Sequence, residues 1–405
     1  MASSTETEPG VPEEGKNNIE FLKQYLEEYA YDDAEKRGIL QELEDQSYRI
    51  TGSDDAKNVR PQLMWDEFAG VGSELSKEDQ VLLSAPVEII HAWTKQLDDI
   101  HDHDQMRNGV ETPHTLLARD MRQEPAEHVT SNHLLDVKSR AYRPVMDANI
   151  PSDTKLNILE SIWEAEEDLA QGQNNDILNT ESVKNPDFKE DRLAYAGKEY
   201  DRFAHMDEIN GKKTGVLFRL IGETVEEVED LETDGLSRYG TALGKAYQVR
   251  DNIVDMIADE EDQGREPFSD LREGTYTEPS HIAERYSRSM AERAETLSEN
   301  AGDEQLAEEY QRHADMYREN AEAIRNVLEA EDPDYDELEE AGRIIMEETP
   351  AMEASQNVAD YWVDMAIGNE DAEIDGALDD VDWEDEAYRK KLETMAVYAG
   401  RQRGK

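Results

Sequence analysis

The sequence LDDIHDHD at residues 97–104 closes a segment of helical apolar periodicity that begins at about Lys77. Asp98 and Asp102 are four residues apart, so a helix places both carboxylates on one face. The residues before them are largely apolar or aromatic, and carboxylates in such surroundings are costly unless they are paired or bind a metal. The segment therefore predicts a helix that presents two aspartates to a divalent cation.

A second segment of the same kind is GKAYQVRDNIVD at residues 244–255. Tyr247, Asp251 and Asp255 again step by four along apolar neighbours. Because the chain is rich in Asp and Glu, a solvated acidic face explains either segment equally well when it is taken alone. Together they predict two helices, each with an aspartate pair.

Strand signals are weak throughout, whereas residues that favour helices dominate the long periodic segments. The sequence therefore predicts an all-α fold. Residues 1–17 are acidic and aperiodic and predict a disordered tail, followed by one helical domain over 18–405. Within it, the Glu- and Arg-rich stretch at about 280–340 predicts an acidic insertion of one or two solvated helices.

The composition excludes several classes of partner and chemistry. The chain has 98 acidic and 42 basic residues, a net charge of −56 and no cysteine. Its pI is near 4.3 and its mean hydropathy is −0.88. Nucleic acids and anionic membranes require a basic surface, and thiolate sites require cysteine. Without a long apolar run or a signal-peptide pattern, the sequence predicts a cytoplasmic protein with no stable membrane insertion.

The acidic residues are dispersed along the chain instead of forming a tail. Their mutual repulsion is screened in molar salt, where the Debye length falls to roughly 3 Å. We therefore expect a halophilic protein.

Six motifs, in order, resemble the trans-isoprenyl diphosphate synthase (polyprenyl synthetase) family. The similarity covers about residues 20–280 and resumes near 338–403. It implies a single helical bundle with aspartate motifs on two facing helices around a central cavity, and a homodimer. The motifs are KNVRP at 57–61, EIIH at 88–91, residues 98–109, GQNND at 172–176 with Lys213-Thr214, residues 244–255 and residues 264–274.

The resemblance implies that an allylic diphosphate ionises and that isopentenyl diphosphate attacks the resulting cation. Aspartates would bind three Mg²⁺ ions, and basic residues would bind the two diphosphates. Polar side chains would stabilise the positive charge near the reacting carbons. The implied metal site is Asp98, Asp99, Asp102 and Asp251, with Asp255 in support. The implied diphosphate contacts are Arg107, Lys213 and Arg265 for the allylic substrate and Lys57, Arg60 and His91 for isopentenyl diphosphate. The implied catalytic residues are Asp98, Asp102, Lys213, Thr214 and Gln248.

Plainer interpretations remain open for some of these residues. His91 also fits a hydrogen-bonded core histidine, and Arg107 and Arg265 fit ordinary partners of nearby carboxylates. His101 and His103 are interleaved with the aspartates, but a helix directs them away from the Asp98 face, so they are left out of the metal site.

The chain departs from the family pattern at four positions. Asn58, Asn108 and Thr275 stand where the family commonly has basic residues, and Asn252 replaces an aspartate of the second motif. Lost positive charges weaken diphosphate binding. The departures favour an alternative, which is a diverged non-catalytic or regulatory subunit, or a relative that binds or ionises prenyl diphosphates without elongation.

The resemblance also implies a product length. Bulky side chains about one turn below the first aspartates act as the floor of the tunnel that holds the growing chain. Trp93 lies five residues before Asp98 and would be this floor. The expected product is C15 to C20, and geranylgeranyl diphosphate is favoured.

Overall fold

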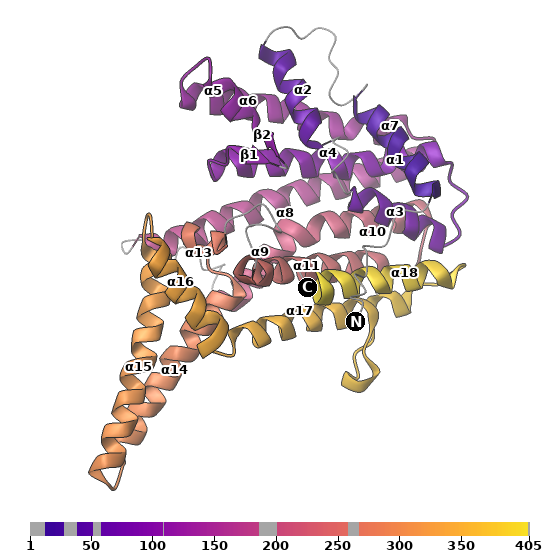
Figure 1. Cartoon of the computed structure of the whole chain (residues 1–405). Helices are drawn as coiled ribbons and strands as arrows, with labels where there is room; N and C mark the ends of the chain where they lie inside the picture. Colours follow the sequence, from indigo (N-terminus) through magenta and orange to yellow (C-terminus); the bar gives the residue numbers. More distant parts are fainter. Residues whose placement is uncertain are drawn as a thin grey trace, which may run out of the picture. The chain divides into compact units, whose positions relative to one another are not determined.

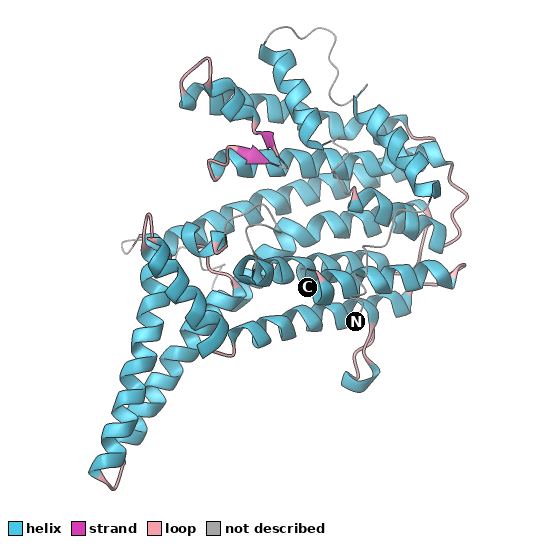
Figure 2. Ribbon diagram, viewed as in Figure 1, coloured by secondary structure: helices cyan, strands magenta, loops and turns pink. Residues whose placement is uncertain are grey.

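The structure is a computed structural model that describes residues 13–27, 39–51, 58–107, 109–185, 201–257 and 267–403. Helices make up most of these residues. The strands described are the antiparallel pair β1 (Met106–Arg107) and β2 (Val110–Glu111) (Figure 2). The all-α prediction is confirmed. None of the helices in the described ranges combines the length and apolarity needed to cross a bilayer.

The chain divides into two compact units, and the single domain over 18–405 stays a prediction. The first unit comprises residues 1–163, 220–236 and 382–389, and the second unit comprises residues 164–219, 237–381 and 390–405. Helices α8 (Ser152–Lys184), α10 (Val216–Val228), α11 (Gly235–Ile257) and α18 (Glu386–Val397) contribute residues to both.

The first unit is built mainly from the N-terminal helices. Helix α1 begins at Glu13, inside the stretch predicted as a tail, and its Leu22 is completely buried, as is Leu26 just after the helix ends. The first twelve residues of that predicted tail lie outside the described part of the chain. The elements of this unit are α1 (Glu13–Tyr25), α2 (Ile39–Thr51), α3 (Val59–Gly70), α4 (Lys77–His101), α5 (Pro113–Ala118), α6 (Gln123–Ser139), the 3₁₀ turn η2 (Arg140–Tyr142) and α7 (Arg143–Asp147).

Helix α4 has local signals for both of its ends. The side chain of Ser76 caps the helix by accepting a hydrogen bond of 3.1 Å from the Asp79 N–H. The last helical residue is His101, and His103 adopts a left-handed conformation with φ of 57°. The helix therefore ends three residues earlier than the predicted boundary at about Asp104.

The second unit packs its helices around two apolar clusters. One includes Phe268, Leu271 and Ile324, and the other includes Val249 and Ile253. The remaining elements of this unit are α9 (Arg202–Asn210), the π-helical turn η4 (Gly211–Gly215), α13 (Ser269–Glu273), α14 (Glu278–Glu299), α15 (Glu304–Glu329), α16 (Tyr335–Arg343), the π-helical turns η5 (Ile344–Glu348) and η8 (Tyr398–Gln402), α17 (Ala351–Ile367), and the 3₁₀ turns η6 (Glu370–Ala372) and η7 (Ala377–Asp380).

Helices α14 and α15 occupy most of the Glu- and Arg-rich segment and run antiparallel, side by side (Figure 1). Large apolar residues are sparse here, but five alanines are buried along the pair, and small side chains let two helices approach closely. Ion pairs such as Arg318 with Glu295 add contacts across the pair. The base of the pair packs on α9, α13, α16 and α17. The buried alanines are Ala283, Ala291, Ala294, Ala314 and Ala321.

Candidate active site

The aspartates of the first motif are divided by the end of α4. Asp98 and Asp102 share one face, and the backbone N–H of Asp102 donates to the Asp98 carbonyl at 2.8 Å as the helix ends. Asp98 is partly buried and Asp102 is exposed. Asp99 points elsewhere, because its side chain is completely buried and paired with Arg107. The structure therefore separates Asp99 from the other two aspartates.

Arg107 lies at the end of β1 and is held beside the end of α4. Its guanidinium donates to Asp99 and lies 3.6 Å from an Asp104 carboxylate oxygen. Burial raises the pKa of Asp99, and Arg107 opposes that shift by favouring the charged form. Arg107 is thus the partner of a carboxylate, as the plainer interpretation states. A guanidinium has five N–H donors, so this pairing leaves donors that a diphosphate could use.

His91 lies on α4 within a cluster of cations. Burial lowers the pKa of His91 well below its ordinary value, and nearby positive charges lower it further. These charges belong to Arg60, Lys95 and Arg107. His91 is therefore neutral at pH 7 and can donate one N–H to a ligand. Lys95 was not among the residues predicted from the sequence, although its spacing of four from His91 places both residues on one helix face.

The structure gives a physical reason for Asn58, one of the departures from the family pattern. Asn58 precedes α3, is buried and has a left-handed conformation with φ of 44°. Asparagine adopts this conformation more readily than most residues with a side chain. Its neighbour Lys57, which is expected to contact isopentenyl diphosphate, lies outside the described residues.

The predicted tunnel floor, Trp93, is partly buried on α4. The Lys138 ammonium of α6 lies 5.1 Å from the centre of its ring, so α6 covers one side of the indole. Ile89 and Ile90, the residues beneath it in the predicted tunnel, are completely buried.

In the second unit, η4 carries the predicted Lys213 and Thr214. The Lys213 ammonium forms an ion pair of 2.5 Å with Asp176, which belongs to the GQNND motif on α8. A Cβ added to Gly172 of the same motif would lie 2.8 Å from the Lys212 Cβ, so glycine permits this close approach of α8 and η4. Two motifs that are 37 residues apart in the sequence are thereby brought together.

Thr214 and Gln248 also meet, as the shared role implied by the resemblance requires. The Thr214 hydroxyl donates to the Gln248 side-chain carbonyl at 2.7 Å. Gly244 on α11 permits this approach, because an added Cβ would lie 2.5 Å from the Gly215 Cα.

The two aspartates of the second motif have different surroundings. Asp251 forms an ion pair of 2.7 Å with Arg403, whose guanidinium also lies 4.0 Å from the centre of the Tyr247 ring. Asp255 instead accepts hydrogen bonds from the backbone N–H groups of Ser269 and Asp270, each at 3.2 Å, and so holds the start of α13.

Asp270 is a candidate that the sequence analysis did not single out. Burial raises the pKa of the Asp270 carboxyl well above its ordinary value, and four neighbouring carboxylates raise it further. In the sequence, Asp270 could have been singled out because it is the first residue of the DLREG stretch at 270–274, which resembles the family. The neighbouring carboxylates are Asp255, Glu273, Asp251 and Asp176.

Four other residues, three of them departures from the family pattern and one a predicted diphosphate contact, have different outcomes. Thr275 lies 3.3 Å from the Thr180 hydroxyl on α8, in a polar contact. Asn252 donates to the buried carboxylate of Glu278 at 2.7 Å. Arg265 and Asn108 lie outside the described residues.

The chemistry of these side chains fits magnesium. Among the residues that the structure describes, no three His, Asp or Glu side chains converge as a ready-made metal site. Mg²⁺ does not need such a cage, because it commonly uses one or two carboxylates together with water and substrate phosphates. Burial is the main cause of the raised pKa of Asp270, and the charges of Asp255, Asp251 and two other carboxylates add to it; a divalent cation would offset that negative charge.

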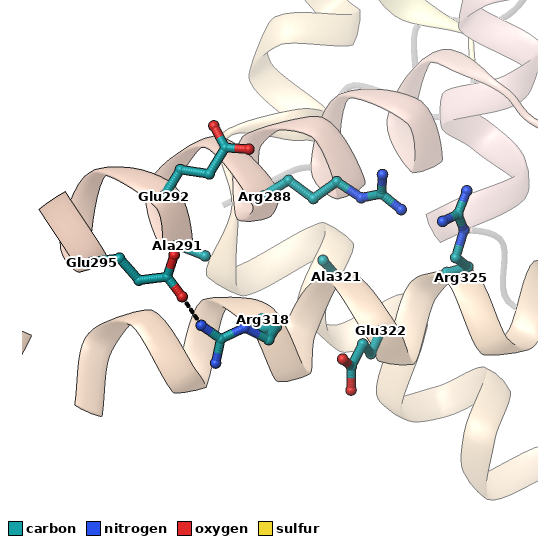
Figure 3. A pocket seen from close by; sticks show the side chains of 8 residues that line it. All are labelled: Arg288, Ala291, Glu292, Glu295, Arg318, Ala321, Glu322 and Arg325. Carbon is teal, nitrogen blue, oxygen red and sulfur yellow. Dashed lines mark hydrogen bonds and ion pairs between the residues drawn. The ribbon is translucent and has the colours of Figure 1, made fainter. Parts of the chain in front are cut away.

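A pocket of about 340 Å³ lies elsewhere, between α14 and α15 (Figure 3). Its walls carry as many arginines as glutamates, and Arg318 pairs with Glu295 across it. No residue of the predicted active site lines it. We interpret the pocket as part of the charged seam of the helix pair.

Two relatives that are similar in sequence are both named as prenyl diphosphate synthases. The chain is 28% identical over 246 residues to a geranylgeranyl diphosphate synthase of Sulfolobus acidocaldarius, covering 59% of this chain and 66% of that protein. It is 29% identical over 232 residues to an octaprenyl diphosphate synthase of Escherichia coli, covering 57% and 62%. The matched region thus spans just under two thirds of these relatives.

The fold has close counterparts among solved structures. A geranylgeranyl pyrophosphate synthase from Corynebacterium glutamicum, complexed with isoprenyl diphosphate and magnesium, matches with a TM-score of 0.70. The match covers 96% of this chain and 99% of that chain at 18% identity. The class of protein is therefore an all-α protein with the isoprenoid synthase fold. The model of the polyprenyl synthetase family matches residues 41–318, and the chain belongs to that family.

Proposed function

We propose that this protein is a magnesium-dependent trans-prenyltransferase that condenses isopentenyl diphosphate with an allylic diphosphate. The observation that carries the proposal is the gathering of cations at α4. Arg60, Lys95 and Arg107 all act electrostatically on His91, in a chain whose net charge is −56. Scarce positive charges that collect beside an aspartate pair fit the recognition of diphosphate groups together with a metal.

The first step is the loss of diphosphate from the allylic substrate. The carbon–oxygen bond breaks, its electron pair leaves with the diphosphate, and an allylic cation remains. Magnesium, when bound, would neutralise charge on the leaving diphosphate. Asp98, Asp102 and Asp251 would hold the metal, with Asp255 in support, and we propose three ions by resemblance to the family. Arg107, Lys213 and Arg265 would hold the allylic diphosphate.

Asp99 receives a different role from the one implied by resemblance. Because it is buried and paired with Arg107, it would orient the guanidinium toward the diphosphate instead of binding metal.

The second substrate would be held through its own diphosphate. Lys57 and Arg60 would supply charge, and neutral His91 would donate one N–H. The double bond of isopentenyl diphosphate attacks the allylic cation, a new carbon–carbon bond forms, and a proton leaves. Thr214 and Gln248 would present oxygen atoms to the positive charge during this step.

We propose a C15 to C20 product, most specifically geranylgeranyl diphosphate. Replacing the indole of Trp93 by a methyl group should deepen the tunnel, so Trp93→Ala is expected to lengthen the product by at least one C5 unit. Radiolabelled isopentenyl diphosphate and reversed-phase separation of the dephosphorylated products would measure the shift. Identical product lengths in wild type and variant would contradict the tunnel assignment.

We also propose a homodimer in the cytoplasm of a halophile. Leu156 and Trp163 are seven residues apart on one face of α8, and their exposed fractions are 63% and 61%. Such large exposed apolar side chains are unusual on an acidic surface and fit contact with a second copy. Sedimentation analysis in molar KCl would test this, and a monomer mass at micromolar concentration would contradict it.

Turnover tests the proposed function directly. Purified protein, farnesyl diphosphate, isopentenyl diphosphate, Mg²⁺ and molar KCl should yield a C20 diphosphate, and EDTA should stop the reaction. Absence of any elongated product under these conditions, with a competent synthase as positive control, would overturn the proposal.

A further inference from the structure

A chain of hydrogen bonds links Glu278, the first residue of α14, to Thr214 in η4. The Asn252 amide donates to Glu278 Oε2 at 2.7 Å, and the Gln248 amide donates to Asn252 Oδ1 at 3.1 Å. The Thr214 hydroxyl then donates to Gln248 Oε1 at 2.7 Å. The other oxygen of Glu278 accepts from the Asn210 amide at 2.8 Å.

The chemistry of these groups gives the chain of hydrogen bonds one direction. Both oxygens of Glu278 accept hydrogen bonds, from Asn210 and Asn252, so Asn252 turns its NH₂ group toward Glu278 and its carbonyl toward Gln248. Gln248 must then donate to Asn252 and present its own carbonyl to Thr214. Thr214 therefore uses its proton in this bond, and its oxygen keeps its lone pairs.

Burial makes reversal of this arrangement costly. Glu278 and Asn252 are only 2% and 7% exposed, so water does not readily replace a lost partner. Burial raises the pKa of Glu278, whereas the donated bonds from Asn252 and Asn210 favour its charged form.

We propose that Glu278 is a positioning residue that acts through Asn252 and Gln248 to hold the Thr214 oxygen as a lone-pair donor. This inference rests on the proposed function, in which Thr214 stabilises positive charge on the substrate. It also explains Asn252. The polyprenyl synthetase family commonly has an aspartate at the position of Asn252, whereas in this protein the nearby carboxylate is that of Glu278 on α14. An aspartate in place of Asn252 would put two buried carboxylates together.

The test uses the variants Glu278→Gln, Asn252→Asp and the double variant. The amide introduced by Glu278→Gln both donates and accepts, so Asn252 and Gln248 are no longer forced to donate in one direction along the chain of hydrogen bonds. We expect kcat to fall about tenfold, with KM for both diphosphates within about twofold of wild type. The double variant moves the one negative charge from α14 to α11. It restores the direction, because the amide introduced on α14 can donate to the carboxylate introduced on α11. Its kcat should return to within about threefold of wild type.

Glu292→Gln is the matched control, because it removes one exposed carboxylate from the same helix and should leave kcat unchanged. Three results would each overturn the inference: a wild-type kcat in Glu278→Gln, no recovery of kcat in the double variant, or a higher kcat in Asn252→Asp alone. In each case, turnover by the wild-type protein would still support the proposed function. No turnover by the wild type would overturn both.

Discussion

Replacing Asp98 by alanine is expected to lower kcat/KM for chain elongation by about a thousandfold. The reason is that Asp98 shares a helix face with Asp102 and is close enough to Arg107 for their charges to interact. Without this carboxylate, the leaving diphosphate would lose part of its charge neutralisation. Steady-state assays with saturating Mg²⁺ would measure the loss.

Glu78→Ala provides the control for Asp98→Ala. Glu78 lies in the first turn of the same helix and is exposed, so its removal changes the net charge equally without touching the proposed site. The control should retain activity within about twofold of wild type. An Asp98→Ala variant that is as active as this control would show that the first aspartate motif does not serve catalysis. A non-catalytic subunit would give that result.

Salt should have the largest effect on stability. The net charge of −56 is spread along the chain, and the Debye length grows from roughly 3 Å at 1 M salt to about 10 Å at 0.1 M. Repulsion between surface carboxylates therefore reaches many more neighbours at low salt. We expect the cooperative thermal transition seen by far-UV circular dichroism in molar KCl to move down by more than about 20 °C, or to be lost, at 0.1 M.

Tetramethylammonium chloride at equal ionic strength separates screening from specific binding of potassium. Equal protection by both salts would support screening. The same melting curve at low and high KCl would contradict the halophilic interpretation, and it would leave the acidic composition without a stabilising role in salt.

The sequence predicts the helices and the side-chain pairs that local spacing controls. Periodicity and the sharing of a face by Asp98 and Asp102 are properties of one helix, and α4 confirms both. The order of the motifs does not say which of them meet, and the structure pairs Lys213 with Asp176 of the GQNND segment. The glycines at positions 172 and 244 are the sequence feature that permits these close contacts, because a side chain at either position would collide with η4.

Contacts that depend on conformation or on distant packing could not be predicted in this way. The pairing of Asp99 with Arg107 depends on β1 returning beside the end of α4, which the spacing within one helix does not encode. The role of Asn58 depends on a left-handed backbone angle. Asn252 looks like a lost aspartate until α14 brings Glu278 against it.

The two aspartate motifs are proposed to serve one reaction, and a double-mutant cycle measures whether they act together. Asp98→Asn, Asp251→Asn and the double variant would be compared by kcat/KM for elongation. Residues that act as a unit give strongly non-additive losses. We predict that the double variant is no more than about threefold slower than the slower single variant. Losses that multiply, or an Asp251→Asn variant with wild-type activity, would contradict the claim.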